Sequence, residues 1–174
     1  ALEFFKELQY EQKLDEARRD LENIIEEQES LSEQTGDETK SLDSLAAEQG
    51  KLSEKFKEFQ EKLRDAKEMN HDLKRPNSIE DTSGEEENTT QEQKSAKENL
   101  ENDQRNKSKQ SQQNAKQQMQ QIGDKLENMQ SSMMMQKMQE DLGDLQAILN
   151  NLIELSFDQE NLMREFKAVN QSDP

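Results

Sequence analysis

Glu68 and His71 are the two residues whose spacing most suggests a chemical function. An E-x-x-H motif supplies half of a carboxylate-bridged di-iron site in helical bundles, where the ligands project inward. In the heptad pattern described below, whose positions a and d are apolar, Glu68 falls at f and His71 at b. Both positions lie on the outer face of a helix, and one chain holds no second histidine to complete the site. The sequence therefore predicts no metal at this pair.

Methionines form a second group that could bind a metal. Met129 and Met133 are four residues apart, as are Met134 and Met138, so each pair is separated by one helical turn. Thioethers select Cu(I), which makes copper binding one hypothesis. Methionine is also an adaptable apolar side chain that suits cores and partner-binding grooves. We expect packing or partner binding, and a copper titration without saturable binding would exclude the alternative.

The rest of the composition excludes most other chemistry. The chain has no cysteine, one histidine and no Gly-rich phosphate loop, so we expect a protein without catalytic residues or cofactors. An excess of Asp and Glu (40) over Lys and Arg (23) gives a formal charge of -17, which argues against nucleic acid as a partner. No run approaches the roughly 18 apolar residues of a membrane span. We therefore expect that this segment is not itself inserted in a membrane. Because the first residue is Ala1 and not Met, we expect a segment of a longer protein.

Only 28% of the residues are hydrophobic, against about 45–50% in a typical soluble domain. Such a chain is either disordered or concentrates its apolar residues in a narrow seam. A coiled-coil seam needs about two apolar positions in seven, which is close to the observed fraction. We therefore predict an all-α fold, in which a long antiparallel helical hairpin or coiled coil is joined by a third long helix in an elongated three-helix arrangement.

Apolar residues at alternating spacings of three and four predict two helices, at about 2–34 and 39–75, within a unit that spans 1–75. Gly36 is expected to end the first helix in a left-handed conformation, and Pro76 follows the second. The heptad phase is unbroken across Gly36, so one continuous rod is the alternative. We prefer a hairpin because it places apolar residues opposite one another. The expected neighbours are Ile24 and Gln49, Leu21 and Leu52, Ala17 and Phe56, and Leu14 and Phe59.

Polar residues occupy three a positions of the predicted hairpin, at Gln28, Gln49 and Asn70. The segment EQESLSE at 27–33 returns as EQGKLSE at 48–54, three heptads later. Buried polar residues at a positions fix the register of coiled coils at some cost in stability. We expect these three residues to specify which helices pair; the alternative is that they are solvated at an edge.

The segment 76–90 gathers Ser, Asn, Thr and Glu and is predicted to be a solvated acidic linker. A third long helix, rich in Gln and Met, is expected over 91–174. Between Leu100 and Ala115 it carries no large apolar residue, so we expect that part to be helical but loosely held. Ser156 and Gln159 have the spacing of a capping box, which predicts a kink or break near residue 156.

The polar stretch from Arg105 to Lys116 is basic, although the chain as a whole is acidic. Runs of this kind usually form a solvated face that balances acidic neighbours, and a site for an anion or a partner is the alternative. The basic residues are Arg105, Lys107, Lys109 and Lys116.

The apolar seam returns after residue 115 and supplies the candidate partner-binding residues. A change of phase between Met133 and Met138 predicts local unwinding or overwinding of a supercoil. We expect this methionine-rich and leucine-rich stretch to bind a protein partner or a second copy of the chain. The candidates are Met129, Met133, Met134, Met138, Leu142, Leu145, Leu149 and Leu152.

Several motifs in the later part of the chain resemble the corresponding parts of one protein family. They are Lys74-Arg75-Pro76-Asn77, Glu80-Asp81-Thr82, the Gln-rich stretch with Ala115 and Met119, Asp141-Leu142, Leu149-Asn150-Asn151-Leu152, and the run Leu155-Ser156-Phe157-Asp158-Gln159-Glu160 with Leu162-Met163. In these motifs the chain resembles an uncharacterised family of large membrane-anchored helical proteins of Bacteroidota, a domain of unknown function. The resemblance implies transmembrane helices upstream and a location in the bacterial cell envelope, in the periplasm. It brings no catalytic residues.

The narrow seams, the polar a positions and the methionine-rich segment predict a non-enzymatic scaffold or adaptor that mediates protein-protein interaction. The resemblance implies that this scaffold lies in the cell envelope. Its partners would be other proteins or a second copy in a homodimer. A chaperone-like helical clamp for unfolded or exported proteins is an alternative function, and copper binding by methionines is another.

Overall fold

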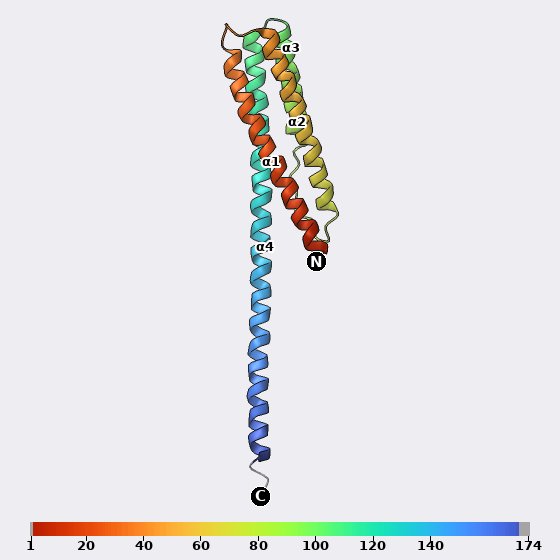
Figure 1. Ribbon diagram of the computed structural model, residues 1–174, viewed down its shortest axis with the longest axis vertical. Coiled ribbons are helices and arrows are strands. Elements are labelled where there is room, and N and C mark those ends of the chain that lie inside the picture. The colour runs from red at the N-terminus through yellow and green to blue at the C-terminus, as the bar shows by residue number, and fades with distance from the viewer. Residues whose placement is uncertain (1, 171–174) are drawn as a thin grey trace. The chain divides into compact units, whose positions relative to one another are not determined.

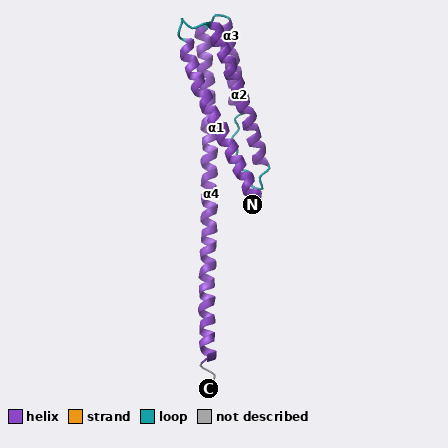
Figure 2. Cartoon of the chain, viewed as in Figure 1, coloured by secondary structure: helices purple, strands orange, loops and turns teal. Residues whose placement is uncertain are grey.

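The computed structural model describes residues 2–170, with side chains to residue 167, and these residues form four α-helices (Figure 1). The helices are α1 (Leu2–Thr35), α2 (Leu42–His71), α3 (Ser83–Glu101) and α4 (Arg105–Asn170). Figure 2 shows helices joined by short loops, without strands among the described residues. The predicted all-α class is confirmed. The chain divides into two units, and the boundary between Ser131 and Ser132 falls inside α4.

The first unit, called the bundle (residues 2–131), packs α1, α2 and α3 alongside the first part of α4 (Figure 1). Each helix buries one stripe of residues at alternating spacings of three and four, which is the pattern that gives a helix one continuous inward face. The stripe of α1 is Tyr10, Leu14, Ala17, Leu21, Ile24, Gln28, Leu31 and Thr35, and that of α4 is Ser108, Gln112, Ala115, Met119, Ile122, Leu126 and Met129. The bundle core is therefore narrow and several residues of it are polar.

The predicted antiparallel hairpin of α1 and α2 is present, in a different register. Gln28 pairs with Gln49, where the sequence analysis placed Ile24 opposite Gln49. A salt bridge of 2.6 Å between Lys55 Nζ and Glu27 Oε1 fits the same alignment. The observed register is favoured because it brings two buried amides together, whereas the predicted one would bury the amide of Gln49 against an aliphatic side chain.

The turn between α1 and α2 differs from prediction in its conformation. α1 ends at Thr35, but Gly36 does not have a positive φ. Instead, the guanidinium of Arg105, at the start of α4, donates to the carbonyls of Thr35 (3.2 Å), Asp37 (3.1 Å) and Lys40. Because the last carbonyls of a helix lack intrahelical donors, this arginine closes α1 without a left-handed residue.

The connection from α2 to α3 is shorter than the predicted linker. α2 ends at His71, where residue 75 was predicted. The Asn70 side chain bonds the backbone of the connection and not a second helix. Its Oδ1 accepts from the N–H of Asn77, and its Nδ2 donates to the Asn77 carbonyl, both at 2.9 Å. The Asn70 side chain thus holds the connection in place, and it does not join the glutamines at the predicted polar seam.

α3 begins at Ser83, inside the segment predicted to be linker. Its acidic run places Glu85 and Glu86 in the first turn, where carboxylates interact favourably with the helix dipole. Lys125 of α4 bonds Glu85 at 2.6 Å and holds the pKa of that carboxyl below its usual value. Acidic residues that suggested a solvated linker therefore start a helix.

The single helix predicted over 91–174 is two helices in the structure. α3 ends at Glu101, and Asp103 adopts a left-handed backbone with a φ of 57° before α4 starts at Arg105. Asp is one of the few residues besides Gly that enter this region, so the turn forms without glycine or proline. The break predicted near residue 156 is absent, because α4 is helical through that position.

The hydroxyl of Tyr10 is buried in the core without a hydrogen-bond partner among the described residues. Its side chain is 1% exposed, and burial raises its pKa. An unpaired buried polar group costs about 1–3 kcal/mol. We therefore expect Tyr10→Phe to raise the unfolding free energy by about 1 kcal/mol and the melting temperature by about 2–4 °C, measured by circular dichroism. A lower melting temperature would show that the hydroxyl is bonded.

Candidate protein-binding surface

The second unit exposes a long series of large apolar side chains on α4 from Met134 to Phe166. Each of them is between 46% and 68% exposed. They are Met134, Met135, Met138, Leu142, Leu145, Ile148, Leu149, Leu152, Ile153, Leu155, Phe157, Leu162, Met163 and Phe166. We call this face the apolar strip. Soluble proteins rarely leave such a contiguous series uncovered, which identifies the strip as the candidate site.

The apolar strip follows a heptad. Position a holds Met135, Leu142, Leu149, Ser156 and Met163, and position d holds Met138, Leu145, Leu152, Gln159 and Phe166. Position g adds Met134, Ile148, Leu155 and Leu162, interrupted by Asp141. Three apolar positions in seven make the strip wider than a minimal coiled-coil seam. Such a face is suited to packing against at least one more helix.

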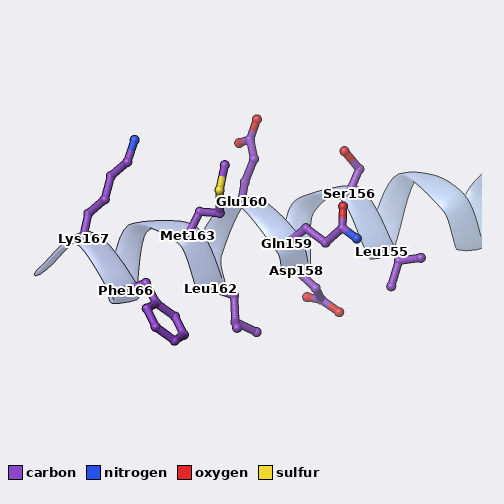
Figure 3. Close-up of a pocket in the computed structure, with 9 residues that line it drawn as sticks. All are labelled: Leu155, Ser156, Asp158, Gln159, Glu160, Leu162, Met163, Phe166 and Lys167. Carbon is purple, nitrogen blue, oxygen red and sulfur yellow. The ribbon is translucent and has the colours of Figure 1, made fainter. Parts of the chain in front are cut away.

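Two polar residues interrupt the seam of the strip, Ser156 and Gln159. Figure 3 shows this part of α4, with Leu155, Leu162 and Phe166 on one side of the helix and Ser156, Glu160 and Lys167 on the other. All nine residues around the hollow in this view belong to one helix. The hollow is therefore a concave length of helix surface, open along its side, and suits another helix better than a small molecule.

Charged residues keep mostly to the outer face of the second unit. Of the ten between Ser132 and Lys167, seven lie at positions b, c or f of the heptad. The other three flank the seam: Asp141 at g, and Glu160 and Lys167 at e. The apolar strip is thus bordered by few charges, which lowers the cost of covering it.

Six of the eight partner-binding residues predicted from the sequence lie exposed on the strip. They are Met134, Met138, Leu142, Leu145, Leu149 and Leu152. Met133 is half-buried. Met129 is 3% exposed and belongs to the bundle core, where its sulfur accepts a hydrogen bond from the N–H of Glu80 at 3.3 Å. Its burial leaves Met129 unavailable to a partner.

Among the apolar residues outside positions a and d, sequence reasoning missed Ile148, Leu155 and Leu162 at position g and the isolated pair Ile153 and Phe157. A search for a strict a and d seam does not find them. The seven-residue spacing of Ile148, Leu155 and Leu162 was the signal available.

The bundle contains a layer of four buried glutamines, one from each helix, and we call it the glutamine layer. Gln28 and Gln49 exchange two hydrogen bonds of 3.0 Å. Gln93 of α3 donates to Gln28 Oε1 at 3.4 Å, and Gln112 of α4 donates to Gln49 Oε1 at 3.1 Å. All four side chains are at most 1% exposed. Because the amides bond one another, we interpret the glutamine layer as part of the packing of the four helices and not as a ligand-binding site.

The stretch between Leu100 and Ala115, which we expected to be loosely held, contributes to the packed core of the bundle. Ser108 and Gln112 are fully buried, and Ser108 Oγ donates to the carbonyl of Ala96 at 2.8 Å. Among the basic residues, Arg105 bonds the turn after α1, and Lys116 forms a 2.5 Å salt bridge with Glu29. Lys107 is exposed. Two of the four basic residues thus serve the bundle itself.

Glu68 and His71, the pair that suggested metal chemistry, lie on the outer face of α2. The His71 side chain is 90% exposed and Glu68 is exposed on the same outer face. Within residues 2–170, no three His, Asp or Glu side chains come together as a metal site. Over the same residues, no helix combines the length and apolarity needed to cross a bilayer.

Comparisons with protein-family models, curated proteins and solved structures find no match to this chain.

Proposed function

We propose that this protein is a non-enzymatic scaffold whose apolar strip binds another helical protein segment. The observation that carries the proposal is the exposure of fourteen large apolar side chains along one helix. Full burial of a side chain of this size contributes about 1.5–3 kcal/mol, so covering even part of the strip would drive association.

The bundle supplies the structured part of the scaffold. Its core is closed by side chains of all four helices, from Phe56 and Phe59 to the glutamine layer. Arg105 bonds the end of α1, and Asn70 holds the connection after α2. The bundle exposes a shorter series of large apolar side chains, at the start of α1 (Leu2, Phe4, Phe5 and Leu8) and at Met69 of α2. The proposal therefore assigns folding stability to the bundle and partner binding to the second unit.

Photo-cross-linking in cells that make the protein tests this function. A benzophenone amino acid replaces Leu149, at the centre of the strip, and in a matched variant it replaces Glu154 on the outer face. We expect covalent protein adducts from position 149 and about tenfold fewer from position 154. Adducts with another protein or with a second copy both support the proposal. Equal yields at the two positions, or no adduct at either, would contradict it.

A chaperone-like clamp is a second candidate, favoured by the exposure of Met134, Met135 and Met138. Flexible thioether side chains adapt to unrelated apolar partners. Such a clamp would suppress aggregation of several unrelated unfolded proteins at a stoichiometric ratio, measured by light scattering. Replacing the three methionines with serine would abolish that suppression, whereas a scaffold with a defined partner would leave aggregation unchanged.

A location in the cell envelope completes the proposal, and its support is the family resemblance carried by residues 141–163. Fractionation of cells into envelope and soluble parts tests it. Recovery of the full-length protein in the soluble cytoplasmic fraction would contradict this location.

A further inference from the structure

The apolar strip is not uniformly apolar. Its polar interruptions and its flanking charges restrict which partner can cover it. We propose that the strip pairs with the strip of a second copy of this chain, with the two helices parallel and in register. This inference rests on the proposed function, since it names the partner of the same surface.

The polar pair in the seam favours the parallel arrangement. In a parallel, in-register pair, every a or d residue meets its own counterpart, so Gln159 meets Gln159 of the second copy. Two glutamine amides can then bond each other, as Gln28 and Gln49 do inside the bundle. In the antiparallel pairing centred on Leu149 and Leu152, Gln159 would face a leucine, Leu142. A buried amide without a partner is costly, so antiparallel pairing is disfavoured.

The residues beside the seam match in the parallel arrangement as well. There each g residue flanks the e residue five positions later in the other chain. The resulting neighbours are Asp141 with Gln146, Ile148 with Ile153, Leu155 with Glu160, and Leu162 with Lys167. No carboxylate faces a carboxylate, and the aliphatic stem of Lys167 can cover Leu162. The chain is strongly acidic, yet this edge carries no like-charge repulsion.

The strip is also large enough to hold two copies together. The twelve apolar residues at positions a, d and g could bury about 700–1,400 Å² per chain at about 60–120 Å² each. A stable interface buries about 800 Å² per partner. The area therefore suffices without help from the bundle.

Sedimentation equilibrium of the full 174-residue chain tests the proposal first. We expect a particle of twice the 20.3 kDa chain mass at micromolar concentration. Replacing Leu145, Leu149 and Leu152 with serine should give a monomer and leave the bundle folded, as reported by the fluorescence of the single tyrosine, Tyr10. A native chain that stays monomeric up to about 100 μM would overturn the proposal.

Disulfide trapping tests the orientation, and the absence of native cysteine gives a clean background. Met138→Cys places a thiol at a d position, where the parallel pair brings two identical thiols within bonding distance. We expect rapid oxidation to a covalent dimer, with at least tenfold slower oxidation of the matched variant Asp144→Cys on the outer face. Faster trapping in a mixture of Met138→Cys and Met163→Cys chains than in either alone would show antiparallel pairing and overturn the proposal.

The variant Gln159→Glu tests the polar layer itself. Parallel pairing would place two carboxylates together in the seam, which disfavours their charged form. We expect the dimer dissociation constant to rise at least about tenfold at pH 7 and to recover near pH 4, where both groups are protonated. The control Gln136→Glu adds the same charge at outer position b and should change little. Equal effects of the two substitutions would contradict a Gln159 layer.

The outcomes separate this inference from the proposed function. If position 149 cross-links another protein while the purified chain is monomeric, the strip remains a binding surface and self-association is refuted. If position 149 yields no adducts at all and the chain is monomeric, both proposals fail.

Discussion

Phe59→Ala is expected to lower the free energy of unfolding of the bundle by about 3–5 kcal/mol. The Phe59 side chain is fully buried, and its ring lies 5.5 Å from the ring of Phe56 between ring centroids. Alanine would remove the ring and leave a cavity in a core that is only one side-chain stripe wide on each helix. A loss of this size is a large part of the 5–15 kcal/mol that typically stabilises a domain.

This loss is measured by urea unfolding, with the fluorescence of Tyr10 as the probe. Tyr10 lies in the bundle core and is the only tyrosine in a chain without tryptophan. The matched control is Phe157→Ala, which removes the same side chain from a position that is 63% exposed on the second unit. We expect the control to leave the bundle transition unchanged. A small effect of Phe59→Ala, comparable to that of the control, would contradict the core described here.

Helix positions in the bundle could be predicted because burial follows a simple period. From Tyr10 to Leu31 the structure buries the residues at positions a and d of the heptad. The same holds from Leu45 to Leu73, where Ala46 at position e is buried as well. Periodicity alone, however, does not show whether a stripe is covered. The seam of α4 has similar spacing on both sides of Ser131, yet Met129 is buried and Met138 is exposed. What differs is the presence of neighbouring helices, which the local pattern does not contain.

The glutamine layer shows a second limit of sequence reasoning. Ser108 and Gln112 extend the three-four spacing back from Ala115, so the signal for an inward face was present. A search for apolar residues does not find this face, because both residues are polar. Their burial is favourable only when Gln49 and the backbone of Ala96 lie opposite, and those partners come from helices that are distant in sequence. The alignment of all four helices is needed before such a residue can be assigned to a core.

Gln49→Leu is expected to destabilise the bundle by about 2–4 kcal/mol, although leucine is the more apolar side chain. Gln49 takes part in three of the four hydrogen bonds of the layer: two with Gln28 and one from Gln112. The substitution would leave the Nε2 donors of both partners buried without these acceptors. Since an unsatisfied buried group costs about 1–3 kcal/mol, two such groups outweigh the gain from burying leucine. Chemical unfolding monitored by Tyr10 fluorescence measures the change.

Replacing all four layer residues with leucine is the matched comparison. This variant buries no polar group at the layer, so we expect its stability to equal or exceed that of the native chain. The variant should also lose the polar contact that fixes the register of α1 against α2. Apolar heptads repeat when shifted by seven residues, so they do not distinguish one register from the next. Several sets of methyl resonances in NMR spectra would reveal the resulting mixture of registers.

If Gln49→Leu alone proves as stable as the native chain, the four amides do not act as one bonded layer. If the fourfold variant keeps a single set of resonances, register is instead determined by the apolar packing or by charge pairs such as Lys55 and Glu27.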